Sequence, residues 1–173
     1  MAAADRPSAE AARPVPPILV FACGNPSRGD DALGPLFVER LEALAPQASW
    51  RSAVETLTDF QLQVEHALDV VGRRCVVFVD AGISGFETFS WSAVVPERDA
   101  SFSSHMMSPS AVLQAYVDVH ARPPPPCFAL CMRAYAVELG QPPGAPALAN
   151  LDAAMGFFLG WLEQAVAIDP AGR

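Results

Sequence analysis

The chain has 173 residues, 51% of them hydrophobic, which suffices for one well-buried domain and is short for two. All eleven basic residues are Arg, so the sequence excludes a phosphate-binding P-loop lysine and a lysine Schiff base. The net charge of −8 argues against nucleic acid and anionic membranes as partners, because neither is drawn to an acidic surface. We expect one domain over residues 18–168, between a disordered lead-in (1–17) and a flexible end (169–173).

The N-terminal segment and the cysteines bear on the cellular compartment. Residues 1–17 lack the apolar core of an export signal, and no run reaches the roughly 18 apolar residues that a membrane span requires. The four cysteines lie in or beside apolar runs without metal-ribbon spacing, which favours buried free thiols. They are Cys23, Cys75, Cys127 and Cys131. These features predict a cytoplasmic protein.

A strand, a loop and a helix open the predicted domain. Residues 18–22 form a continuous apolar run typical of a buried strand, and a Gly-Asn-Pro-Ser turn follows at residues 24–27. The helix that begins near Ala32 carries its apolar residues on one face. These are Leu33, Leu36, Phe37, Leu41 and Leu44. In open α/β folds such a loop lies at the carboxyl edge of the sheet, where ligands bind.

Strands and helices then alternate along the rest of the chain. The predicted strands lie within residues 50–57 and at 75–79, 89–95 and 128–137, and the predicted helices at 61–68, 111–119 and 147–166. Ser108 with Pro109 marks the start of the second of these helices. The four prolines at 123–126 predict an extended connector. The pattern indicates an α/β fold with three layers, a mostly parallel twisted sheet covered by helices on both faces.

Two adjacent acids, Asp30 and Asp31, lie between the first strand and its helix. An acid at a helix start caps free N–H groups and stabilises the helix by about 0.5 to 2 kcal/mol, and we assign that role to Asp30. Asp31 is then free to point over the sheet edge. Two acids at that edge make a poor phosphate site and a plausible metal site.

Asp80 ends the strand at residues 75–79, where a buried and unpaired carboxylate costs several kcal/mol. We therefore expect Asp80 to face the same cleft as Asp31. A lone loop histidine such as His105 is more often a surface residue than a ligand. His66 and His120 lie in helical runs, and we interpret them as structural.

The motifs around these acids resemble those of the hydrogenase maturation endopeptidases, which cleave a C-terminal extension from the large subunit of nickel-iron hydrogenases. In that family the first strand runs into Gly-x-Gly-Asn, then Asp followed by Asp or Glu, then Gly. The matching positions are Gly24, Asn25, Asp30, Asp31 and Gly34. Ala22 replaces the first glycine, where a methyl group is expected to fit. Arg28, in the same loop, is interpreted as a surface residue.

Two further stretches resemble the family in the expected order. Residues 76–81 are similar to its second metal-binding strand, and residues 103–109 to the loop that carries its metal-binding histidine. The resemblance thus implies Asp31, Asp80 and His105 as metal ligands and Asp31 and Asp80 as catalytic residues. It covers roughly residues 18–165.

The resemblance also implies the metal and the partner. In the family the metal is nickel already inserted in the hydrogenase large-subunit precursor and held there by cysteine thiolates, so the protease needs no tightly bound cofactor of its own. Two carboxylates and a neutral imidazole suit nickel or zinc. We expect a monomer that meets this precursor, and cleavage that verifies nickel insertion.

Other interpretations stay open at this point. Either nickel polarises the scissile carbonyl or its bound water, or one of the two Asp residues acts as general base on a water. The main alternatives are a hydrolase of small substrates with its own zinc and, less favoured, a nucleotide-binding module. A nucleotide-binding module is less favoured because this sequence lacks the three-glycine fingerprint of such modules, and because an acid pair at the helix start repels a pyrophosphate.

Overall fold

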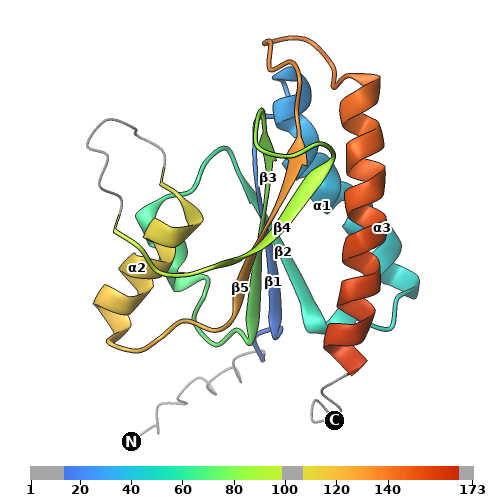
Figure 1. Ribbon diagram of the computed structural model, residues 1–173. Coiled ribbons are helices and arrows are strands. Elements are labelled where there is room, and N and C mark those ends of the chain that lie inside the picture. Colours follow the sequence, from blue (N-terminus) through green and yellow to red (C-terminus); the bar gives the residue numbers. More distant parts are fainter. Residues whose placement is uncertain (1–13, 99–106, 168–173) are drawn as a thin grey trace, which may run out of the picture.

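The computed structural model describes residues 14–98 and 107–167, and within them the chain forms a five-stranded sheet (Figure 1). The strand order is β2-β1-β3-β5-β4. The strands are β1 (Ile18–Cys23), β2 (Val54–Asp59), β3 (Cys75–Gly82), β4 (Phe89–Val94) and β5 (Cys127–Arg133). All neighbours run parallel except β4, which is antiparallel to β5. The predicted mostly parallel sheet is confirmed.

Helices cover both faces of this sheet, as predicted. Figure 1 shows α1 and α3 on one side and α2 on the other. The α-helices are α1 (Leu33–Leu44), α2 (Pro109–His120) and α3 (Ala145–Ala167). Short 3-10 helices are η1 (Gly29–Ala32), η2 (Ala45–Gln47), η3 (Arg51–Ala53) and η4 (Val64–Leu68). No helix in the described part of the chain is long and apolar enough to cross a membrane.

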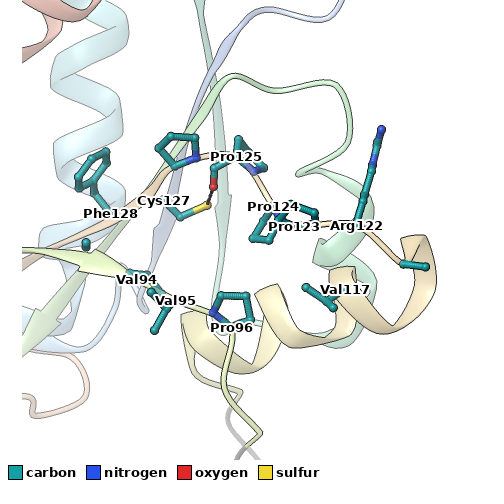
Figure 2. Close-up of a pocket in the computed structure, with 13 residues that line it drawn as sticks. Val94, Val95, Pro96, Val117, Arg122, Pro123, Pro124, Pro125, Cys127 and Phe128 are labelled. Carbon is teal, nitrogen blue, oxygen red and sulfur yellow. Dashed lines mark hydrogen bonds between the residues drawn. The ribbon is translucent and has the colours of Figure 1, made fainter.

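The proline run forms the expected connector between α2 and β5. Residues 123–126 adopt no regular structure and lead directly into Cys127, whose thiol donates to the Pro125 carbonyl at 3.1 Å (Figure 2). Upstream of this run, α2 begins as predicted, with Pro109 at its first position and the Ser108 hydroxyl accepting from Ala111 N at 3.1 Å. Local sequence signals therefore predicted both the start of α2 and the extended connector that follows it.

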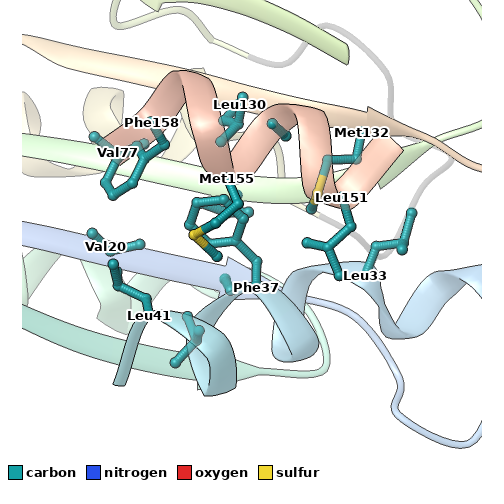
Figure 3. Close-up of a cluster of buried hydrophobic side chains, with 14 of the residues drawn as sticks. Val20, Leu33, Phe37, Leu41, Val77, Leu130, Met132, Leu151, Met155 and Phe158 are labelled. Carbon is teal, nitrogen blue, oxygen red and sulfur yellow. The ribbon is translucent and has the colours of Figure 1, made fainter. Parts of the chain in front are cut away.

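Alternating side chains of the strands fill two cores, one on each face of the sheet. Toward α1 and α3, Val20 and Val77 pack with Phe37 and Phe158 in the cluster shown in Figure 3. Toward α2 and η4, the buried residues belong to a second cluster. It includes Leu19, Phe21, Val76, Phe78, Val112, Leu113 and Tyr116. All six residues of β1 are buried, which explains its continuous apolar run.

Three strand ends differ from the sequence prediction by two residues or more. The second strand extends to Asp59 and β3 to Gly82, because the ladder with neighbouring strands continues through these polar ends. The last strand ends at Arg133 and not at residue 137, because the backbone at Tyr135 and Ala136 turns away to meet another loop. The differences between predicted and observed strand ends thus lie at the carboxyl edge of the sheet, where the candidate site lies.

The four cysteines are free, as predicted. Cys23 and Cys127 are buried, whereas Cys75 and Cys131 are only half-buried. Burial raises the pKa of all four thiols, to about 11 or 12. None of them is therefore a thiolate at neutral pH, and none is suited to act as a nucleophile.

Candidate functional site

The glycines at the β1–α1 turn let the strand end and the helix start come into close contact. A Cβ on Gly24, whose φ is +142°, would lie 2.0 Å from the Asp31 carbonyl oxygen. A Cβ on Gly34 would lie 2.0 Å from the Cys23 carbonyl oxygen. Ala22, in contrast, is fully buried in the sheet, and its methyl group fits there. The two glycines are thus required by backbone contacts that position Asp31.

Asp31 and Asp80 line one cleft of about 390 Å³ at the carboxyl ends of β1 and β3. Cys23 also lines this cleft, as do Met107 and Pro109 at the start of α2. Among the described residues, neither carboxylate takes part in an ion pair. The cleft therefore presents two uncompensated acids.

The carboxylate of Asp31 is fixed by the loop that precedes it. Its Oδ2 atom accepts a hydrogen bond from Asn25 N at 3.0 Å, and the Asn25 side chain accepts one from Ser27 N at 2.9 Å. The loop thereby holds the acid against the end of β1. The Gly-Asn pair of the motif thus positions this carboxylate.

The carboxylate of Asp80 has a raised pKa of about 6. The main cause is partial burial: the side chain keeps an exposed surface, but the walls of the cleft displace much of its water. A hydrogen bond from Ala81 N at 2.7 Å opposes the shift, and the nearby Asp31 charge adds to it. A cation placed between the two acids would relieve both the desolvation and the repulsion.

A third acid, Asp59, lies close to these two at the end of β2. After burial, the charges of Asp80, Asp59 and Asp31 raise the pKa of the Cys23 thiol, so all three acids lie near that thiol. The Nε2 atom of His66 lies 3.4 Å from Asp59 Oδ2, while its Nδ1 accepts from Gln63 N at 2.9 Å. Asp59 was not predicted from the sequence as a site residue, although it ends a strand at the same edge.

Asp30 does not cap its helix, contrary to the sequence prediction. It is only 1% exposed, and its oxygens accept hydrogen bonds from three backbone N–H groups of the loop after β5. The donors are Tyr135 N at 2.7 Å, Ala136 N at 2.9 Å and Gly144 N at 2.7 Å. Burial alone would raise the pKa of Asp30, but these bonds outweigh it and lower the pKa. Asp30 is thus a buried anchor between two loops.

Further backbone bonds join the same two loops beside the cleft. Gly29 N donates to Gln141 O at 2.9 Å, and Gly140 N donates to Ser27 O at 2.7 Å. The Arg28 side chain, interpreted from sequence as a surface group, is exposed and lines the cleft, and its Nε donates to Val137 O at 2.9 Å. The loop that carries Asp31 is therefore held rigidly by the loop after β5.

Comparison with known proteins gives matches among solved structures. No protein-family model and no curated protein matches the sequence. The NiFe hydrogenase maturation protease HycI from Thermococcus kodakarensis KOD1 superposes with a TM-score of 0.65 at 19% identity, over 86% of this chain and 93% of HycI. The hydrogenase maturating endopeptidase HybD from E. coli gives 0.64 at 21% identity, over the same shares of the two chains. The chain has the fold of the hydrogenase maturation proteases.

A further structure agrees with this result. HybD from Thermococcus kodakarensis, also a NiFe hydrogenase maturation protease, gives a TM-score of 0.61 at 16% identity, over 84% of this chain and 98% of its own. The resemblance inferred from the sequence motifs is thus confirmed at the level of the fold. The maturation-protease fold places the ends of β1 and β3, with Asp31 and Asp80, side by side at one sheet edge.

His105, the third ligand implied by the family resemblance, lies outside the described residues, so its role stays a prediction. Within residues 14–98 and 107–167, no three His, Cys, Asp or Glu side chains are grouped so as to hold a metal ion. The described acids thus form an incomplete ligand set, and they need a further donor for tight metal binding.

A second cavity, of about 780 Å³, is shown in Figure 2 and lies at the amino ends of the parallel strands, opposite the acids. It is bounded by the end of β4, the C-terminal turn of α2 and the proline connector. Among the described residues that line it, Arg122 is the only charged one. Although this cavity is larger than the acid cleft, its described lining contains no Asp, Glu or His, and burial raises the pKa of its one thiol, Cys127. The acid cleft is therefore the candidate site.

Proposed function

We propose that this protein is a nickel-dependent endopeptidase that removes the C-terminal extension of a nickel-iron hydrogenase large-subunit precursor, and that it recognises the nickel already inserted in that precursor. One observation carries the proposal. Two carboxylates without an ion-pair partner among the described residues converge on an open cleft, in a chain with the fold of solved hydrogenase maturation proteases.

The surroundings of the cleft favour a protein substrate over a small molecule. Large apolar side chains follow the carboxyl ends of three strands of the sheet, and each is more than half exposed. They are Phe60 after β2, Ile83 after β3, and Tyr135 and Leu139 after β5. Exposed apolar residues gathered at one end of a molecule are typical of a protein-binding surface. Phe60 also lines the cleft of the two acids.

In this proposal Asp31, Asp80 and His105 bind the nickel of the precursor, whose thiolates supply the other ligands. Three protein ligands leave the metal open to a water or to the scissile carbonyl. Asp80 also suits the role of general base, because a carboxylate with a pKa of about 6 is ionised at neutral pH and still accepts a proton readily. A precursor without inserted nickel lacks the ion through which the two proteins would bind each other.

The proposal includes a cytoplasmic location and a monomeric protease. Four free thiols, two of them only half-buried, fit a reducing compartment, because an oxidising one promotes disulfides. The acidic net charge also disfavours nucleic acid and anionic lipid as partners.

We expect the free protein to bind nickel, zinc or cadmium only weakly, with a Kd of about 1 μM or higher, because its ligand set is incomplete. Lowering the pH below about 6 should weaken binding further, since Asp80 becomes protonated and protons compete with the cation. His105→Ala and Asp31→Asn should each reduce the affinity. Isothermal calorimetry at pH 7.5 and pH 5.5 measures all three effects.

Either of two results would instead favour the zinc hydrolase. Stoichiometric zinc that copurifies with the protein, or picomolar zinc binding unchanged by His105→Ala, would show a resident metal centre. Asp118→Asn, on the exposed face of α2, is the control and should leave metal affinity unchanged.

A further inference from the structure

The outer edge of β2 carries backbone groups that face away from the sheet. No strand pairs with this edge within residues 14–98 and 107–167. Gly24 N donates to Asp59 O at 3.1 Å, so the main chain of Asp59 faces β1. Because successive residues of a strand present their N–H and C=O groups to opposite sides, the main chains of Thr56 and Thr58 face outward. These two residues offer two donors and two acceptors to a further strand.

A groove runs along this edge and opens into the acid cleft. A cavity of about 220 Å³ between β2 and α1 shares Pro35 and Thr58 with a neighbouring cavity of about 290 Å³. That second cavity shares Gly24 and Phe60 with the cleft of Asp31 and Asp80. We call the two cavities the β2–α1 groove. Its lining includes Pro35, Glu39, Glu42, Thr56, Thr58 and Phe60.

The charge of the groove is uniform. The charged residues that line it, Glu39, Glu42 and Asp59, are all acidic, and both glutamates are exposed on α1. The groove spans Thr56 to Phe60, which at a rise of about 3.3 Å per residue is roughly 13 Å, the length of a four- or five-residue extended peptide. An extended peptide with Lys or Arg side chains fits both the backbone groups and the charge.

We propose that the β2–α1 groove binds an extended, basic segment of the client polypeptide next to the cut site, as an additional strand paired with Thr56 and Thr58. This inference rests on the proposed function, because the groove leads to the acids that would act on the bound chain. Strand addition fixes the direction and register of the substrate through main-chain bonds, while Glu39 and Glu42 select its side chains. The scissile bond is thereby delivered to Asp31 and Asp80.

The backbone part of the inference is tested by Thr58→Pro. Proline removes the outward N–H of Thr58 and spares the bonds to β1, and an edge strand tolerates it. With nickel-loaded precursor, we expect the KM to rise about tenfold while kcat changes less than about twofold, which corresponds to loss of one or two hydrogen bonds. The matched comparison is Thr58→Val, which keeps the N–H and should raise the KM much less than Thr58→Pro does.

The charge part is tested by the double variant Glu39→Lys and Glu42→Lys. Reversal of both charges should raise the KM by about tenfold or more at low salt, and added salt should reduce the difference from wild type. Glu163→Lys, an exposed charge reversal on α3 outside the groove, is the control and should behave as wild type. This pair keeps the inference testable even if Thr58→Pro fails to fold.

Hydrogen exchange gives an independent readout of strand pairing. In the Asp80→Asn variant mixed with nickel-loaded precursor, the amide of Thr58 should exchange more slowly than in the free variant. Unchanged KM values in Thr58→Pro and the double variant, with active wild-type enzyme, would overturn the groove assignment alone. Wild-type protein that cleaves no precursor at all would overturn the proposed function. A dimer dissociated by Thr58→Pro, measured by light scattering, would show that a second copy occupies the edge and would overturn this inference.

Discussion

Asp31→Asn and Asp80→Asn are each expected to lower precursor cleavage by roughly a thousandfold and to leave the fold intact. Asparagine keeps the shape of each side chain and one acceptor oxygen, so the bonds from Asn25 N and Ala81 N survive. What is lost is the negative charge that binds the cation and accepts a proton. Cleavage rates measured by intact mass, beside circular dichroism of each variant, test the expectation.

The control for both variants is Asp152→Asn, which removes an exposed carboxylate of α3 that pairs with Arg40 of α1. It should cleave at the wild-type rate. If Asp31→Asn or Asp80→Asn processes the precursor within about threefold of wild type, that residue is not part of the metal site. Misfolding of both variants would show that the acids have a structural role that the geometry does not reveal.

Asp30→Asn should cause the largest loss of stability, about 3 kcal/mol in the free energy of unfolding. An amide has only one acceptor oxygen, so at least one of the three N–H donors at Tyr135, Ala136 and Gly144 is left buried without a partner. The charge that strengthens the other bonds is lost as well. Urea unfolding at pH 7 measures the difference from wild type.

The pH dependence of this effect has a definite sign. The pKa of Asp30 is lowered in the folded protein, so its contribution is present above the unfolded pKa, near 4, and is lost as the pH falls through the folded value. The gap between wild type and Asp30→Asn should therefore shrink in acid. A gap below about 0.5 kcal/mol at pH 7, the size expected for the surface residue Asp152, would contradict the anchor role.

The parts of the fold that could be predicted are those with local signals. The run at β1 is apolar throughout because helices bury both faces of the strand, and Ser108-Pro109 marks the start of α2 through a single turn of backbone. The end of β2 lacks such a signal, because an edge strand tolerates the polar Thr58 and Asp59. The sequence thus indicates the centre of the sheet better than its edge.

The same distinction applies to the candidate site. Asp31 and Asp80 were expected to meet because each follows a buried parallel strand, and the ends of such strands lie at one edge. The anchor role of Asp30 was missed because its donors lie 105 to 114 residues further along the chain. The contact between Asp59 and His66 was missed for a related reason: the strand and the 3-10 helix that carry them are placed by tertiary packing against Phe21.

The central claim is that cleavage depends on nickel held by the substrate. The most direct measurement incubates the wild-type protein with nickel-loaded and nickel-free forms of the same hydrogenase large-subunit precursor and follows the intact mass of the precursor. We expect the loaded form to lose its C-terminal extension and the empty form to stay uncut. Equal cleavage of both forms, or none of the loaded form, would contradict the account.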